Sequence, residues 1–377
     1  MDIKIKKITE PIPHAKIADV LWKTYFKEYG NAGALQWSEE YAKFYFESIL
    51  PKESSRDFIF GAFDKDRLVG TTIGHRDVVV FENRLNLETV NLGLTAVDPE
   101  YKRQGIAKKL VSRLMDHAKE KKLDIVMAFP EKGRFGDKLL KDYFDFTNFG
   151  KAKHLIKLME ERGLEVLREY MKMNVILVKL AGIFSHIPEI DELDGTIRPA
   201  KIEETDEVRE ILNSYATRVP LVNFYSHDGY KESNLGFAKM NERFGDPWGF
   251  HWLVLERNRK IMATLSYRVE IVSFEIEEDQ LESAPVALMT SLGCHESLEL
   301  DDKVQFVAAI LRNIRTELPE IFVSQITSPQ HELKVFDKLK FNKDRNTYFL
   351  YIKPLTEKGE ELNTYKKFKE HLLNYYR

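Results

Sequence analysis

The chain has 377 residues, 43% of them hydrophobic, and this length and composition favour two globular domains over a single core. Its 57 basic and 60 acidic residues give a net charge of −3, which argues against a nucleic-acid partner. The only cysteine, Cys294, excludes an internal disulfide framework and a zinc site made of several cysteines. The charged beginning Met-Asp-Ile-Lys-Ile-Lys-Lys is unlike a signal peptide, and no apolar run reaches membrane-spanning length. We therefore expect a cytoplasmic protein with no membrane partner.

Strand and helix periodicities alternate through the first part of the chain. In chain order they predict a strand Ile3–Ile8, helices His14–Tyr29 and Ser38–Leu50, a hairpin of Phe58–Asp64 with Arg67–Val80, a strand Leu85–Val97, a helix Gln104–Lys121 and a strand Leu123–Phe129. A helix Phe135–Phe146 should follow, and then two strands that close the same sheet, Ala152–Leu158 and Val175–Leu180, around a helical insert Glu160–Tyr170.

The same order of elements begins again after an acidic linker, so we infer a tandem repeat of one fold. The second set comprises a strand Thr196–Pro199, helices Glu203–Tyr215 and Tyr230–Phe244, a hairpin of Trp252–Glu256 with Lys260–Val272, a strand Pro285–Gly293, a helix Asp301–Glu317, a strand Ile321–Ile326, a helix Glu332–Leu339 and a strand Tyr348–Ile352. The predicted fold class is α/β (α+β), with a mixed, mostly antiparallel sheet in each domain. The predicted units are a first domain 1–182, a linker 183–195, a second domain 196–355 and a C-terminal helix 356–377.

The segment Leu92–Leu110 carries the most specific pattern in the chain. It reads as a buried strand, a turn containing a proline, a basic loop around Gly105 and an amphipathic helix. Backbone N–H groups and the helix dipole point at whatever lies before such a helix, and Lys102 and Arg103 add positive charge there. Since glycine lets the main chain approach an anion closely, we predict that this loop binds a pyrophosphate. The alternative is an ordinary turn with a solvated Lys/Arg cluster.

This segment resembles the acetyl-CoA-binding motif of the GNAT (Gcn5-related N-acetyltransferase) superfamily, which reads Arg or Gln, two residues, Gly, one residue, Gly or Ala. Gly105 and Ala107 match the last two positions, and Lys102 replaces the usual Arg or Gln while keeping a positive charge. The resemblance implies that acetyl-CoA is the co-substrate. It also implies that the pantetheine arm pairs with the backbone of Thr95, Ala96 and Val97, and that the pyrophosphate is wrapped by Lys102, Arg103, Gln104, Gly105, Ile106, Ala107 and Lys108.

The resemblance also points to candidate catalytic positions. Some GNAT enzymes place a glutamate on the strand before the motif, and Asn91 stands at that position, which leaves a water chain or a remote glutamate as the base. Glu88 lies on the opposite face of the strand, and Gly93 can mark a bulge that reverses the faces beyond it. The family's usual acid for the leaving thiolate is a tyrosine on the helix after the fifth strand. Tyr143 lies in that region, although it can equally pack its ring in the core.

The second copy lacks the basic loop. Its strand is followed by Glu296, Glu299, Asp301 and Asp302, whose charges would repel a pyrophosphate. We therefore expect a degenerate second GNAT-like domain that binds no acetyl-CoA, and that either completes the acceptor pocket or braces the first domain.

The predicted function is acetyl-CoA-dependent N-acetyl transfer to an amine of a small molecule or peptide. The alternative is a non-catalytic acyl-CoA sensor or scaffold, which the missing strand carboxylate supports. The 10 histidines show no ligand spacing, so we expect no metal. The protein should be a monomer or a homodimer.

Overall fold

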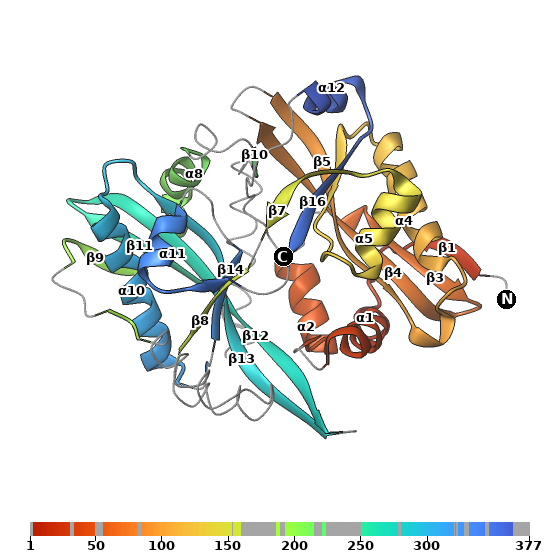
Figure 1. Ribbon diagram of the computed structural model, residues 1–377, viewed down its shortest axis with the longest axis horizontal. Helices are drawn as coiled ribbons and strands as arrows, with labels where there is room; N and C mark the ends of the chain where they lie inside the picture. Colours follow the sequence, from red (N-terminus) through yellow and green to blue (C-terminus); the bar gives the residue numbers. More distant parts are fainter. Residues whose placement is uncertain are drawn as a thin grey trace.

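The computed structural model contains two eight-stranded sheets that lie side by side, each flanked by helices (Figure 1). This confirms the predicted mixed, mostly antiparallel fold. The structure describes residues 3–30, 34–49, 56–81, 85–152, 154–159, 186–188, 193–214, 221–223, 250–277, 280–319, 321, 323–327, 332–343 and 347–364. The predicted elements Glu160–Tyr170, Val175–Leu180 and Tyr230–Phe244 lie outside these residues.

The first sheet has the strand order β1-β3-β4-β5-β6-β16-β7, with β10 paired to β4. All neighbours are antiparallel except β5 and β6. Its strands are β1 (Ile3–Lys7), β3 (Ile59–Asp64), β4 (Arg67–Phe81), β5 (Leu85–Val97), β6 (Ile125–Ala128), β16 (Tyr348–Pro354), β7 (Thr147–Ala152) and β10 (Leu221–Asn223).

The second sheet has the order β15-β8-β14-β13-β12-β11-β9, with β2 paired to β12, and its parallel pair is β13 with β14. Its strands are β15 (Asn342–Lys343), β8 (His154–Leu158), β14 (Val323–Thr327), β13 (Gln280–Cys294), β12 (Lys260–Glu277), β11 (Phe250–Arg257), β9 (Thr196–Pro199) and β2 (Ala34–Leu35). Read from β1 and from β9, the two sheets therefore repeat one topology.

The two halves of the chain exchange a strand. β8, from the first half, lies between β14 and β15 of the second sheet, and β16, from the second half, lies between β6 and β7 of the first. The prediction that 152–158 closes the first sheet and 348–352 the second is therefore wrong about the sheet. The strands themselves form as expected, but the hydrophobic pattern of a strand does not specify which of the two sheets it joins.

Helices cover both faces of each sheet. In the first half, apolar residues of α4 and α5 form one core with the sheet, while α1 and α2 form another on its opposite face. These helices are α1 (His14–Tyr29), α2 (Glu39–Phe44, continued by a π-helical turn Tyr45–Ile49), the 3₁₀ turn Pro99–Tyr101, α4 (Ile106–Glu120) and α5 (Phe135–Phe144).

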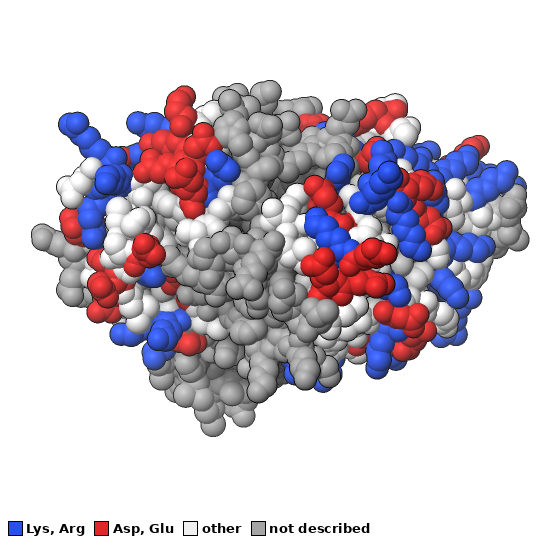
Figure 2. Space-filling model, turned by 90° about the horizontal axis from the view of Figure 1, so that it is seen from above, with Lys and Arg blue, Asp and Glu red and all other residues white. Residues whose placement is uncertain are grey.

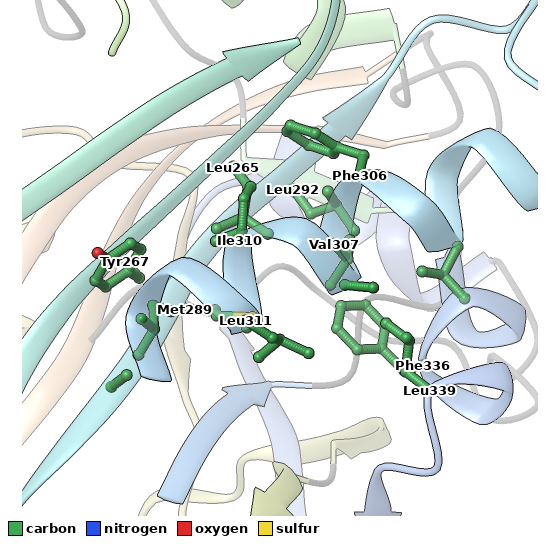
Figure 3. Close-up of a cluster of buried hydrophobic side chains, with 14 of the residues drawn as sticks. Leu265, Tyr267, Met289, Leu292, Phe306, Val307, Ile310, Leu311, Phe336 and Leu339 are labelled. Atoms are coloured by element: carbon green, nitrogen blue, oxygen red, sulfur yellow. The ribbon is translucent and has the colours of Figure 1, made fainter. Parts of the chain in front are cut away.

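The second half has the same arrangement, with α10 and α11 on one face of its sheet and α8 on the other. In Figure 3, Phe306, Val307 and Leu311 of α10 point at strand residues such as Leu265 and at Phe336 of α11. The helical segments here are the 3₁₀ turn Ile202–Glu204, α8 (Thr205–Asn213), α10 (Leu300–Glu317), α11 (Leu333–Lys338), α12 (Glu357–Glu360) and the 3₁₀ turn Glu361–Thr364. The rest of the predicted C-terminal helix and most of the predicted linker lie outside the described residues.

Further contacts join the halves in a reciprocal way. β2, which follows α1, pairs with Val272 and Ser273 of β12, and β10, which follows α8, pairs with the end of β4. The buried Tyr41 of α2 donates a hydrogen bond of 2.9 Å to Glu270 of β12.

Figure 2 shows the face of the molecule seen from above, where basic and acidic side chains are interspersed over the described parts of both halves. Among the described residues, no helix is both long and apolar enough to cross a membrane.

A buried lysine fastens the exchanged strand β8. Lys157 is fully buried, and its ammonium donates hydrogen bonds to the carbonyl oxygens of His186 (2.9 Å) and Leu339 (2.7 Å) at the end of α11. Burial, with a smaller effect from the charge of Lys340, lowers the pKa of Lys157 to about 8. The exchanged strand β8 thus carries a buried cation, and the burial of its charge is unfavourable for folding.

We predict that residues 1–182 do not fold on their own. Without β16, both β6 and β7 lose the strand between them and expose unpaired backbone groups. Circular dichroism of this fragment should show no cooperative melting transition, while the full chain melts cooperatively. A sharp transition in the fragment would mean that the exchanged strand is dispensable.

We also predict that Lys157 makes stability rise with pH. The unfolded chain holds the proton up to the ordinary pKa of 10.5 and the folded chain only up to about 8, so the unfolded state binds more protons between these values. Over this interval the free energy of unfolding should increase by up to about 3 kcal/mol relative to Lys157→Met, which has no such proton. Urea titrations at several pH values measure it, and parallel curves for the two proteins would contradict it.

Candidate functional site

The two parallel strands of the first sheet separate before β5 ends. β5 pairs with β6 only from Thr89–Ile125 to Leu92–Ala128, whereas its pairing with β4 continues to Val97. Beyond Leu92, the edge of β5 that faced β6 has no strand partner among the described residues. This edge offers backbone N–H and C=O groups to an extended ligand.

A β-bulge at Gly93 accompanies the separation. Ile73 of β4 pairs with Leu94 and Gly74 pairs with Leu92, so Gly93 is the extra residue. Before the bulge, Val90 and Leu92 pack in the α4 core, and beyond it Leu94 and Ala96 pack on the α1 side. The predicted reversal of the faces is confirmed.

The turn after β5 leads the chain into α4 in a fixed conformation. Asp98 accepts hydrogen bonds from the amide of Glu100 (3.0 Å) and from Arg67 (2.8 Å). Arg103 and Gly105 have positive φ angles of 64° and 73°, and a Cβ at position 105 would meet no atom within 4 Å. The loop therefore bends back on itself and leaves open space next to the helix end.

This helix end has the features of an anion site. Gly105 is the N-cap of α4 and contributes no capping side chain, and the first turn holds no acidic residue. The amides of residues 105–108 meet no acceptor among the described residues, while Ile106 and Ala107 anchor the helix in the core. The side chains of Lys102, Arg103, Gln104 and Lys108 are exposed around the opening. Free amides, a helix dipole and lysine and arginine charges together favour a bound phosphate.

Comparison with known proteins agrees with this geometry. A family model described as an acetyltransferase (GNAT) domain matches residues 21–139, which include the bulge, the loop and α4. Residues 21–139 of the chain therefore form a GNAT domain. No curated protein sequence shows significant similarity to it.

Solved structures share the fold across nearly the whole chain. N-myristoyltransferase of Saccharomyces cerevisiae with bound myristoyl-CoA superposes with a TM-score of 0.72 at 11% identity, covering 93% of this chain and 82% of that one. A GCN5-related N-acetyltransferase from Anabaena variabilis gives a TM-score of 0.57 at 10% identity, with coverages of 94% and 73%. At these identities the likeness concerns the fold.

The three predicted pantetheine-pairing residues lie on the open part of β5. The Thr95 hydroxyl is hydrogen-bonded to Thr72 at 2.8 Å, and Ala96 and Val97 are buried. The carbonyl oxygen of Val97 already accepts a hydrogen bond of 3.0 Å from Thr24 of α1. A ligand that forms a hydrogen bond to the carbonyl oxygen of Val97 has to share this oxygen with Thr24.

Tyr143 lies beside the first turn of α4, next to the loop predicted to bind the pyrophosphate. It is 62% exposed, so the alternative that its ring packs in the core is wrong. The ammonium of Lys108 lies 4.6 Å from the centre of its ring, a cation–π contact. Since β5 extends about 3.3 Å per residue, the bulge at Gly93 is roughly 13 Å from the start of the loop. The position of Tyr143 therefore favours contact with the phosphate end of a ligand over contact at the bulge.

Asn91 lies at the point of separation, on the face opposite α4. It is buried, and its Oδ1 has no hydrogen-bond partner among the described residues. Its cross-strand neighbour is His75 of β4, and a Cβ at position 93 would lie 3.3 Å from Cδ2 of that imidazole. Glu88 pairs instead with Arg76 at 3.3 Å, so it is a surface carboxylate as expected.

His75 is a site residue that the sequence analysis missed. Its Nε2 is 2.5 Å from the hydroxyl of Tyr45, which lies in the π-helical turn after α2. Burial, with a smaller contribution from the nearby charge of Arg268, lowers the pKa of His75 to about 4. In the observed pairing of β4 with β5, His75 lies opposite Asn91. An antiparallel pairing of the predicted strands Arg67–Val80 and Leu85–Val97 is the signal that could have found it.

The second half repeats the β-bulge and the early end of the parallel pairing, but the charges at its helix end differ. Thr290 of β13 is a bulged residue, and the pairing of β13 with β14 stops at Met289–Ile326. However, the first turn of α10 carries Asp301 and Asp302. Acidic side chains thus stand where the first half has lysines and glycine. In the part of the chain that the structure describes, no group of three His, Cys, Asp or Glu residues is arranged to hold a metal ion.

We predict that Gly105→Glu abolishes CoA binding while the protein stays folded. The new carboxylate would enter the space before α4 and repel a phosphate there, weakening binding by at least about 100-fold. Gly133→Glu is a matched control, because Gly133 also has a positive φ, 82°, and open space around it. Calorimetry with CoA and a thermal melt of each variant measure the effects. Equal loss of binding in both variants would refute the assignment of the loop.

Proposed function

We propose that this protein is an acyl-CoA-dependent N-acyltransferase that transfers an acetyl group from acetyl-CoA to an amine of a small molecule or peptide. The observation that carries the proposal is the open edge of β5 leading directly to the uncapped, basic N-terminus of α4. An extended arm that ends in a pyrophosphate matches this arrangement in both shape and charge.

In this proposal the residues of the loop and of β5 have separate roles. The loop from Lys102 to Lys108 binds the pyrophosphate through backbone amides and positive side chains. Thr95 and Ala96 present the backbone edge for the pantetheine arm, and the thioester lies at the bulge. Asn91, an amide at the family's position for the base, orients the acceptor amine through Oδ1 but takes no proton from it.

The acceptor approaches from the face of the sheet opposite α4. The α4 face of β5 is filled by the packed core around Val90 and Leu92. The opposite face at the bulge is polar, with Asn91 and His75, and Arg268 of the second half contributes its charge there. The second half thus forms part of the acceptor site and not a second nucleotide site.

A non-catalytic acyl-CoA sensor is the second candidate, favoured by the asparagine at the position of the base. Incubation with acetyl-CoA and a panel of primary amines and short peptides separates the two, with free thiol as the readout. Thiol release that depends on both amine and protein supports transfer. Tight CoA binding without release from any amine supports the sensor. Myristoyl-CoA in place of acetyl-CoA tests the choice of acyl group.

We predict one CoA site per chain. The second half places Asp301 and Asp302 at its helix end, and repulsion of about 4 kcal/mol between unit charges ~4 Å apart exceeds a helix-end attraction of ~1 kcal/mol. Calorimetry should therefore give a stoichiometry of one, lost in Gly105→Glu. Two equivalent sites would show that the second loop binds as well.

We predict that Tyr143 contributes to CoA affinity more than to the chemical step. The ring lies against Lys108, so Tyr143→Ala should raise the KM for acetyl-CoA several-fold, while Tyr143→Phe keeps the ring and should stay within about threefold of wild type, a difference of ~0.6 kcal/mol. If the phenol were the acid that protonates the thiolate, Tyr143→Phe would instead lower kcat by about 100-fold or more at unchanged affinity. Steady-state kinetics of both variants decide.

A further inference from the structure

A tyrosine–histidine pair lies at the bulge of β5, where the candidate site contains no strand carboxylate. The hydroxyl of Tyr45 is 2.5 Å from Nε2 of His75, and the Cδ2–Nε2 edge of the imidazole faces the place that a Cβ of residue 93 would occupy. Any side chain at position 93 would crowd the ring, since its Cβ would lie 3.3 Å from Cδ2 and 3.4 Å from Nε2. The absence of a Cβ at position 93 thus leaves room for the imidazole beside the bulge.

The pair leaves one ring nitrogen available. Tyr45 is buried and is held by edge-on contacts with the rings of Trp37 and Phe46. When its oxygen accepts the Nε2–H of His75, the other nitrogen, Nδ1, carries a lone pair. Nδ1 has no hydrogen-bond partner among the described residues.

We propose that His75 carries the proton during acyl transfer, taking it from the acceptor amine and giving it to the sulfur of CoA. This inference rests on the proposed function and adds the missing base and acid to it. A neutral amine attacks the thioester carbonyl, so that a C–N bond forms, and the nitrogen's proton passes to Nδ1. The C–S bond then breaks with its electron pair on sulfur, and the thiolate takes the proton back from Nδ1. The products are an amide and free CoA, and His75 is neutral again.

The surroundings of His75 favour the neutral imidazole, so that a proton taken up by the ring is held only briefly. Burial first, and then the charge of Arg268, hold its pKa at about 4, so the ring is neutral at physiological pH and needs no prior deprotonation. Once formed, the imidazolium is a strong acid and protonates a thiolate readily. Asn91 faces the ring from β5, Tyr45 from α2's extension and Arg268 from β12, and of these only Arg268 is charged at neutral pH.

Arg268 occupies the position in the second half that His75 occupies in the first. Each is the second residue of its strand after the register shift opposite the bulge, at Ile73/Gly74 and at Ser266/Tyr267. Arg268 is buried and donates from Nε (2.9 Å) and Nη2 (2.7 Å) to Glu270, which also accepts from Tyr41. The same position is thus a fixed cation in one copy and, in this proposal, the proton carrier in the other.

The test is turnover with acetyl-CoA and an amine identified from the panel, with CoA affinity and melting temperature measured in parallel. His75→Gln should lower kcat by about 100-fold or more at unchanged CoA affinity, because the phosphate loop is untouched. Added imidazole should restore part of the activity of His75→Ala. Tyr45→Phe should lower kcat less, since it leaves the His75 imidazole in place but removes the hydroxyl that fixes the tautomer of this imidazole. His295→Gln, on an exposed histidine of the second half, is the matched control and should behave as wild type.

The outcomes separate the two proposals. Wild-type protein that transfers acetyl groups, together with a folded His75→Gln that retains kcat within about threefold, overturns the role of His75 and leaves the proposed function standing. A large fall in kcat for His75→Ala without rescue by imidazole assigns the residue a packing role and also overturns the proposal. Wild-type protein that binds CoA but transfers to no amine overturns the proposed function, and this inference with it.

Discussion

The end of the pairing between β5 and β6 is the feature on which the candidate site depends. Two parallel strands in a sheet share hydrogen bonds along their length, and here the ladder stops at Leu92 and Ala128, where β6 ends and the bulge at Gly93 follows in β5. The same bulge exposes a backbone edge, reverses the side-chain faces of the strand and directs its end into the loop before α4. One glycine therefore determines where a ligand can pair with the chain and which side chains stand beside it.

The exchange of β8 and β16 keeps the two copies in one arrangement. Because each sheet is completed by a strand of the other half, neither half can rotate without breaking its own sheet. The reciprocal pairings of β2 with β12 and of β10 with β4 add to this constraint. The arrangement brings Arg268 close enough to influence His75, so the properties of a residue in the first copy depend on the second copy.

Local patterns predicted the elements well and their partners poorly. Helix α1 was expected at its observed bounds, and β3, β5 and α4 within two residues, because periodicity, turns and caps are encoded locally. The sheet predicted for the strands 152–158 and 348–352 was wrong, because the hydrophobic pattern of a strand does not specify which sheet it joins. The loop around Gly105 was predicted from its own residues and from their resemblance to a family motif, both of which are local. His75 was not, since a histidine in a strand becomes informative only once its register places it beside Gly93 and Tyr45.

The two copies show that backbone geometry alone does not make an anion site. Both have a bulge, both end a parallel pairing at the same point relative to it, and both continue into a helix on the same face. In the second copy, however, Asp301 and Asp302 occupy the first helical turn and draw Arg257 (3.0 Å) and Lys338 (3.6 Å) into ion pairs. The helix dipole there is already met by the chain's own carboxylates, while in the first copy it remains available to a ligand. Duplication thus supplied two equivalent backbone arrangements, and in the proposed function the acidic charges at one helix end restrict the nucleotide to the other copy.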